Sequence, residues 1–218
     1  MLPLYWLAQY LGAFLGAAFV YAVYFDAIDR FDGGIRMTTG YNATAGIFAT
    51  YPQEFLSAGS GVLDQTVGTA ILTMCVFAVN DPRNVDVPMY FLPLLVGLVV
   101  GTVGMSFGYN CGFAINPARD LGPRIFTALS GWGNEVFSYR NYNWFWVPLV
   151  GPHLGAVIGT IIYMLFVGIH WPATFEKRDV RPKTEELLAN EPARALMLPG
   201  DRQMDSTSKS LLSRSFNY

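Results

Sequence analysis

Two long segments without a charged side chain constrain this sequence more than any other feature. Residues 88–108 and 144–169 contain no Asp, Glu, Lys or Arg. A helix needs about 20 consecutive apolar residues to cross the hydrocarbon core of a bilayer, which is about 30 Å thick. Both segments reach that length, and hydropathy adds two further candidates at residues 3–25 and 62–80. The sequence therefore predicts an all-α membrane protein with four transmembrane helices.

Composition agrees with this class and argues against several others. Of the 218 residues, 52% are hydrophobic and 14% are charged, whereas about 25% are charged in an ordinary soluble protein. The net charge of -2 gives no basic excess, so we expect no binding to nucleic acid. Cys75 and Cys111 could form one pair at most, and we expect each to be a small packing residue instead. His153 and His170 lack metal-ligand spacing, and no acid–base pair or activated nucleophile is recognisable. We therefore expect no enzyme, no cofactor and no metal site.

The segment Asn116–Asp120 (Asn-Pro-Ala-Arg-Asp) places polar and charged residues between two apolar segments. Asn116 is a favourable N-cap, and Pro117 at the first helical position lacks only an N–H group that would have no partner there. Residues 121–132 are too short to cross a bilayer and are interrupted by glycine and proline. At membrane depth, non-helical backbone is tolerated only where protein buries it or where it lines a watery cavity. We therefore predict a re-entrant half-helix that begins at this motif.

This motif and its neighbourhood resemble the major intrinsic proteins and, within them, the aquaglyceroporins. The resemblance covers about residues 1–172. It implies an aquaporin-like helical bundle, and we expect this chain to correspond to the family pattern from the third span onward, without the first two spans and the first signature half-helix. Besides the motif, the resemblance rests on Gly104-Met105-Ser106-Phe107-Gly108, Gly112-Phe113-Ala114, Gly122-Pro123-Arg124 and Trp146-Val147-Pro148-Leu149. The markers of the glycerol-conducting branch are Tyr51, Asp120, Arg124, Pro148 and Leu149.

The resemblance also implies the roles of individual residues. Arg119 would be the cation of the selectivity constriction, Phe113 its apolar wall, and Gly104 would leave space for a wider solute. Asn116 would donate its side-chain amide to the permeant, and backbone carbonyls of the preceding loop would replace lost hydration. The expected pore and filter residues are Asn116, Pro117, Ala118, Arg119, Phe113, Gly104, Gly112 and Ala114.

Three ionisable residues within or beside the apolar segments each have two interpretations. Arg119 is either an arginine that snorkels to the interface or, as is usual for an intramembrane charge, part of a functional site. Asp64 in a predicted span is either a proton-relay residue or a structural acceptor; the resemblance implies that it accepts hydrogen bonds from the motif loop. Asp120 can pair with Arg124 four residues later, which in an exposed setting would contribute a few tenths of a kcal/mol. The resemblance implies that Asp120 also widens the pore, and both interpretations can hold together.

Two weak signals agree on the orientation of the chain. A polar loop follows the first span and contains the sequon Asn42-Ala43-Thr44, which can be glycosylated only outside the cytoplasm. Residues 173–218 hold eight of the 14 Lys and Arg residues, which favours a cytoplasmic location. We therefore expect a channel domain over residues 1–172, a disordered cytoplasmic tail over residues 173–218, and insertion in the plasma membrane. Glycines at four-residue spacing within the spans predict close helix packing.

The expected function is passive conduction of glycerol, water and other small neutral solutes such as urea, by a homotetramer in membrane lipid. Two alternatives remain open. The chain is a truncated, non-conducting subunit that associates with full-length channels, or it is an ion-coupled carrier in which Asp64 titrates.

Overall fold

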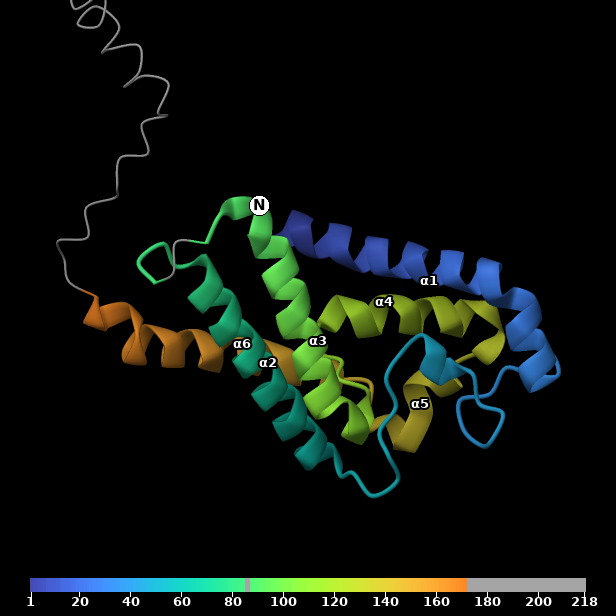
Figure 1. Ribbon diagram of the computed structural model, residues 1–218. Coiled ribbons are helices and arrows are strands. Elements are labelled where there is room, and N and C mark those ends of the chain that lie inside the picture. The colour runs from blue at the N-terminus through green and yellow to red at the C-terminus, as the bar shows by residue number, and fades with distance from the viewer. Residues whose placement is uncertain (85–86, 172–218) are drawn as a thin grey trace, which may run out of the picture. The chain divides into compact units, whose positions relative to one another are not determined.

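The computed structural model describes residues 1–84 and 87–171, and within those ranges it is built from helices without strands. Four helices are long and apolar enough to cross a membrane, which confirms the predicted fold class (Figure 1). Residues Met1–Trp171 form one compact unit. The predicted tail, residues 173–218, lies outside the described residues. The membrane-length helices are α1 (Leu2–Asp32), α2 (Ala58–Asn80), α3 (Leu92–Cys111) and α6 (Val147–Phe166).

Shorter helices fill the connections between these four. The predicted re-entrant helix is α4 (Pro117–Thr127), which starts at the expected residue and continues into a π-helical segment, η3 (Ala128–Trp132). It is followed by α5 (Glu135–Tyr142) before α6 begins. Three single turns complete the described chain: η1 (Ala45–Ile47), η2 (Met89–Phe91) and η4 (Gly168–His170).

The first helix is longer than hydropathy predicts. The apolar segment ends near residue 25, and the following acidic residues were expected in a loop. Instead α1 continues through Asp32 and ends at Gly33, whose φ of 67° is left-handed and whose N–H bonds to the carbonyl of Asp29. Hydropathy locates the part of a helix that lies in lipid, whereas a glycine in this conformation locates its end. The expected loop boundary is therefore corrected from residue 25 to residue 32.

Helices α2 and α6 pack closely along one glycine face. A Cβ atom added to Gly155 would lie 2.7 Å from the Cβ of Thr69, and one added to Gly159 would lie 2.9 Å from the Cα of Ala70. Both distances are far below van der Waals contact, so these backbones meet only because the glycines lack side chains. The glycine-packing prediction is confirmed here. It is wrong for the other spans at Gly12, Gly16, Gly97 and Gly101, where no described atom lies within 4 Å of such a Cβ.

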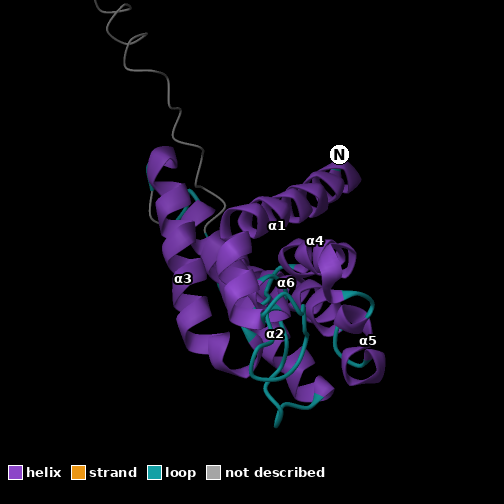
Figure 2. Cartoon of the chain, turned by 90° about the vertical axis from the view of Figure 1, so that its right-hand side faces the viewer, coloured by secondary structure: helices purple, strands orange, loops and turns teal. Residues whose placement is uncertain are grey.

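The half-helix α4 lies against α1, as Figures 1 and 2 show from two directions. At the crossing, a Cβ on Gly122 would lie 2.8 Å from the Cβ of Ala13 and 2.9 Å from the carbonyl oxygen of Tyr10. Further along, the rings of Phe14 and Phe126 meet edge to face with centroids 5.7 Å apart. These contacts fix the position of α4 along α1, and thereby the position of the motif at its start.

A polar cluster ties the end of α2 to α6. Asp81 receives two hydrogen bonds of 2.9 Å from the guanidinium of Arg83 and one of 2.9 Å from the hydroxyl of Tyr163 on α6. Arg83 also reaches the carbonyl of Gly168 at 3.4 Å. These donors lower the pKa of Asp81 to about 2, chiefly through the hydrogen bonds from Arg83. The carboxylate therefore stays charged and joins both helix ends.

Candidate functional site

The loop between α3 and α4 has an unusual backbone. Gly112 has a φ of 83°, and the non-glycine residues Phe113 and Ile115 have φ values of 44° and 38°. Side chains disfavour this region, and each such residue costs on the order of 1–3 kcal/mol unless its surroundings enforce the conformation. The contacts that hold residues 112–116 are therefore the first determinants of the site.

One of these contacts comes from a buried amide on α2. The oxygen Oε1 of Gln65 accepts a 2.7 Å hydrogen bond from the backbone N–H of Ile115. The nitrogen Nε2 of the same side chain donates to Oδ2 of Asp64 at 2.9 Å and lies 3.0 Å from Sγ of Cys111. Gln65 is fully buried. Gln65 was not among the residues predicted from the sequence, although a polar residue in an apolar span next to Asp64 is a usable signal.

The expected hydrogen bonds from the loop of residues 112–116 to the carboxylate of Asp64 are not present among the described residues. Asp64 accepts instead from Nδ2 of Asn110 at 2.7 Å, from Gln65, and from the thiol of Cys111 at 3.4 Å. Asn110 and Cys111 are the last residues of α3. The carboxylate is one residue too early along α2 to reach Ile115, so it is connected to that residue through Gln65. Cys75 and Cys111 are both free thiols.

Asn116 caps α4 and leaves one end of its side chain unused by the cap. Its Oδ1 accepts from the N–H groups of Ala118 at 2.9 Å and Arg119 at 3.3 Å. The carbonyl end of the amide is thus committed to the helix start, and the NH₂ end remains for another partner. Asn116 lines two cavities, of about 330 Å³ and about 630 Å³.

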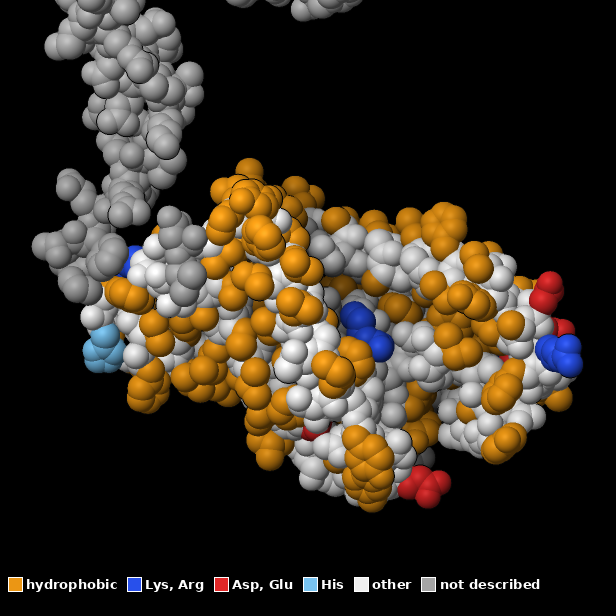
Figure 3. All heavy atoms as spheres, in the orientation of Figure 1, with side chains coloured by type: hydrophobic (Ala, Val, Ile, Leu, Met, Phe, Trp, Pro, Cys, Tyr) orange, Lys and Arg blue, Asp and Glu red, His pale blue; other side chains and the backbone are white. Residues whose placement is uncertain are grey.

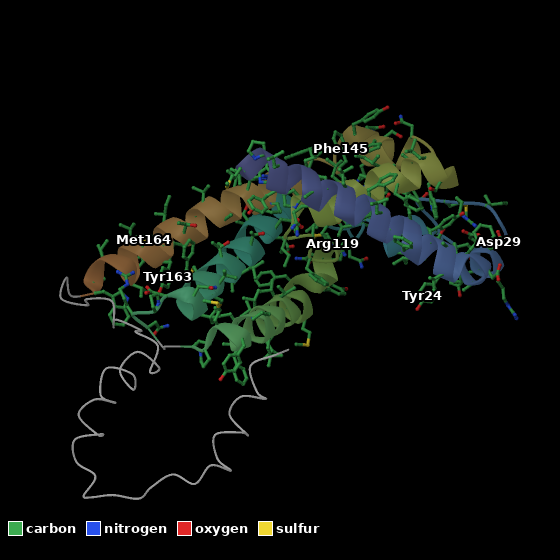
Figure 4. The ribbon with its side chains drawn as sticks, turned by 90° about the horizontal axis from the view of Figure 1, so that it is seen from above. Tyr24, Asp29, Arg119, Phe145, Tyr163 and Met164 are labelled. Atoms are coloured by element: carbon green, nitrogen blue, oxygen red, sulfur yellow. The ribbon has the colours of Figure 1, made fainter. Side chains whose placement is uncertain are left out.

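Arg119 lines the same two cavities and is half-buried. Its guanidinium makes no ion pair or side-chain hydrogen bond with the described part of the chain. The carbon Cζ lies 5.9 Å from the centre of the Phe113 ring. Figure 4 shows Arg119 among the helices, away from the ends of the bundle, and Figure 3 shows basic atoms at a hollow in the middle of an apolar face. Free donors therefore face the cavities beside an aromatic wall.

Phe113 lies directly on Gly104 of α3. A Cβ on Gly104 would be 3.0 Å from two ring carbons of Phe113, and one on Gly108 would be 3.4 Å from the ring. The space left by Gly104 is therefore occupied by the ring itself. A side chain at this position would push the ring toward the smaller cavity, which Phe113 and Ala114 line together with Pro117.

A second arginine on the same helix has the opposite environment. Arg124 has no exposed surface, and its guanidinium bonds to Asp120 at 2.9 Å, to the carbonyl of Val136 at 2.8 Å and to that of Thr50 at 2.6 Å. Its Cζ lies 4.7 Å from the ring centre of Tyr51. The predicted pairing of Asp120 with Arg124 is confirmed, but the pair is buried rather than exposed, because α4 enters the protein instead of running along its surface.

Three of the five branch markers expected from the sequence, Tyr51, Asp120 and Arg124, lie together beside Thr50. The N–H of Thr50 donates to Asp120 at 2.8 Å and its hydroxyl donates to the same carboxylate oxygen. The indole N–H of Trp144 donates to the Thr50 carbonyl at 2.9 Å. Pro148, one turn further on at the start of α6, is fully buried, and Leu149 follows it. Thus Arg124 contacts both Tyr51 and Asp120.

Comparison with known proteins decides which family has this arrangement. The family profile described as "Major intrinsic protein" matches residues 2–163. The chain belongs to the major intrinsic protein family. The motif at the start of α4 and the membrane-length helices therefore belong to an integral membrane protein of this family.

Individual members of the major intrinsic protein family show how far the similarity reaches. The chain is 52% identical to human aquaporin-9 over 171 residues, which cover 78% of this chain and 58% of that protein. It is 48% identical over 168 residues to aquaporin-2 of Milnesium tardigradum, covering 77% of this chain and 52% of the relative. The chain thus spans about half the length of the curated relatives it matches.

A solved structure extends the comparison to three dimensions. The aquaglyceroporin from Plasmodium falciparum superimposes with a TM-score of 0.66 at 30% identity, covering 77% of this chain and 65% of that one. The resemblance to aquaglyceroporins stated from the sequence is confirmed by these similarities. The role of each pore residue stays a prediction.

Proposed function

We propose that this chain forms part of a passive channel for glycerol, water and other small neutral solutes such as urea. The observation that carries the proposal is the pairing of Arg119 with Phe113 on the wall of the smaller cavity. A glycerol molecule has a hydrocarbon edge and a hydroxyl edge, and this wall offers an aromatic surface to one and guanidinium and amide donors to the other. The name of the solved relative, an aquaglyceroporin, agrees with this substrate class.

Electrostatics supports selection for neutral solutes. The first turn of α4 carries the positive end of the helix dipole, equivalent to about half an elementary charge, and Arg119 adds a full one. A cation that approached Asn116 would therefore be repelled, whereas a neutral polyol would experience no such repulsion. Backbone carbonyls of Gly112, Phe113 and Ala114 complete the proposed conduit, because carbonyls replace hydration without adding charge.

The ion-coupled carrier receives less support from the contacts of Asp64. This carboxylate is buried, accepts from three donors, and belongs to neither cavity that Asn116 and Arg119 line. A relay residue needs access to the transport path. The contacts of Asp64 favour a bracing role.

The proposal includes the assembly and orientation expected from the sequence. The chain would act in the plasma membrane, within a homotetramer, with the loop of residues 33–57 and the motif loop outside and residues 173–218 in the cytoplasm. The alternative of a subunit that does not conduct by itself remains the competing proposal, because the chain spans about half of its curated relatives.

Stopped-flow light scattering on proteoliposomes tests the proposal. Glycerol and sucrose gradients would be applied to the 218-residue chain and to a fusion with the N-terminal part of human aquaporin-9 placed before Met1. The proposed pore would be supported if the fusion conducts glycerol and if Arg119→Ala changes that glycerol flux. Flux through the fusion but not through the 218-residue chain would show that the chain conducts only as part of a longer protein, and no flux through either folded protein would refute conduction.

A further inference from the structure

The hydroxyl of Thr44 is part of the folded interior. Thr44 is 1% exposed, and its Oγ1 donates to Oδ2 of Asp32 at 2.9 Å while accepting from the indole N–H of Trp132 at 3.2 Å. Asp32 is held in turn by Arg36 at 2.5 Å and by the N–H of Gly34 at 3.0 Å. One hydroxyl thus joins the end of α1 to the end of the re-entrant segment.

Backbone hydrogen bonds close the segment between Met37 and Ala45 into a compact loop. The N–H groups of Thr44 and Ala45 both donate to the carbonyl of Met37, at 3.1 and 3.3 Å. The N–H of Ala43 donates to the carbonyl of Gly40 at 3.2 Å. The loop therefore cannot extend without breaking these bonds together with those of the Thr44 side chain.

The same threonine is the third residue of the sequon Asn42-Ala43-Thr44. N-glycosylation needs this pattern because the hydroxyl residue is recognised together with the asparagine. In the folded protein Asn42 is half-buried, and the required hydroxyl is bonded to Asp32 and Trp132. Folding and modification therefore need the same group.

We propose that Asn42 is an N-glycosylation site that can be modified only before the loop of residues 37–45 closes. In the reaction, Nδ2 of Asn42 forms a bond to the first sugar carbon of a lipid-diphosphate-linked oligosaccharide. The bond between that carbon and the phosphate breaks, the lipid diphosphate leaves, and one Nδ2 proton is released. The fraction of modified chains then measures how long the loop stays open during synthesis.

A pulse-chase experiment in animal cells tests this timing through the mobility shift that an N-glycan-removing endoglycosidase abolishes. Wild type is expected to acquire its glycan during the pulse and to gain none in the chase. Trp132→Phe keeps an aromatic ring but removes the N–H bonded to Thr44. Because one buried hydrogen bond shifts an equilibrium by about two- to tenfold, the ratio of modified to unmodified chains should rise by that factor.

A second sequon in the same loop provides the matched control. Met37→Asn in an Asn42→Gln background creates a site whose hydroxyl belongs to Thr39, which is exposed and bonded to no described residue. Glycosylation at this new site reports the orientation of the loop. The ratio of modified to unmodified chains at the new site should not change with Trp132→Phe. The proposal is overturned if wild type gains glycan during the chase, if Trp132→Phe changes both sites equally, or if neither site is modified.

These results do not depend on transport. A channel that conducts glycerol but carries no glycan at Asn42 would refute the timing proposal alone, and a glycosylated chain that does not conduct would refute the function alone.

Discussion

The backbone N–H of Ile115 and Oε1 of Gln65 lie 2.7 Å apart, and this hydrogen bond joins a residue with a φ of 38° to the middle of the bundle. A glutamine can present either end of its amide. Asp64 can only accept when it is ionised, so it attracts Nε2 at 2.9 Å and leaves Oε1 for Ile115. We therefore regard Asp64 as a positioning residue that acts through Gln65.

This relationship predicts a specific rescue. Asp64→Asn should let the Gln65 amide turn, lose the bond to Ile115, and lower glycerol permeability of the conducting protein by about tenfold, the equivalent of about 1.4 kcal/mol. Adding Gln65→Glu should restore flux, because both carboxylate oxygens accept and the asparagine amide introduced by the first substitution can donate to one of them. Permeability and thermal unfolding would be measured together. A double variant no better than Asp64→Asn would show that the orientation of Gln65 is not the cause.

Two substitutions of Arg119 should distinguish the effect of its charge from the effect of its hydrogen-bond donors. Arg119→Lys keeps the positive charge but loses the planar set of donors, so glycerol permeability should fall severalfold while sodium stays excluded. Arg119→Ala removes both and should admit a measurable sodium current. Glycerol flux and sodium leak in the same proteoliposomes provide the two readings. Equal effects of both variants on both readings would argue against a filter role.

Arg124 should instead control stability. Replacing it with Met leaves Asp120 buried without its cation, and removal of one partner of a buried ion pair costs about 3–5 kcal/mol. We expect Arg124→Met to unfold in mild detergent, whereas Arg119→Met should unfold close to the wild-type temperature. Thermal unfolding followed by circular dichroism compares the two variants. Similar melting temperatures would contradict the assignment of these two arginines.

The different surroundings of Gly155 and Gly97 provide a second matched pair of variants. Gly155→Ala would place a methyl group 2.7 Å from the Cβ of Thr69 and closer still to the carbonyl oxygen of Thr66, so α2 and α6 must separate. Overpacking of this kind costs about 1–3 kcal/mol. Gly97→Ala meets nothing within 4 Å and should be neutral or slightly stabilising. Unfolding temperatures of the two variants check this, and a destabilised Gly97→Ala would reveal a helix contact outside the described residues.

The hydrogen bonds of Asp81 predict that the folded state loses stability in acid at the C-terminal end of α2. Its folded pKa of about 2 lies below the ordinary value of 3.8. The stabilisation is therefore present above an unfolded-state pKa of 3.8 and is lost as the pH falls toward 2. Asp81→Asn should lower the unfolding temperature at neutral pH, and its difference from wild type should shrink as the pH falls between those two values. A constant difference over that range would exclude the carboxylate as the source.

The sequence by itself determined the class of this protein and the start of its re-entrant helix. Long uncharged segments have one solution in a bilayer, because every backbone group must be bonded within its own helix. Asn116 and Pro117 specify a helix start through local geometry alone, and the structure places that start where they predict it. Signals confined to a few neighbouring residues or to one span could therefore be interpreted without the fold.

The tertiary structure decided which residues that are far apart in the sequence contact one another. Arg119 and Arg124 lie on one helix and look alike in the sequence, but only the path of α4 against α1 and the Thr50 segment makes one free and the other buried. Likewise, Gln65 rather than Asp64 accepts from Ile115, because a single helical step of about 100° decides which side chain faces Ile115. Such choices depend on side-chain direction relative to a partner segment, and no local pattern encodes that direction.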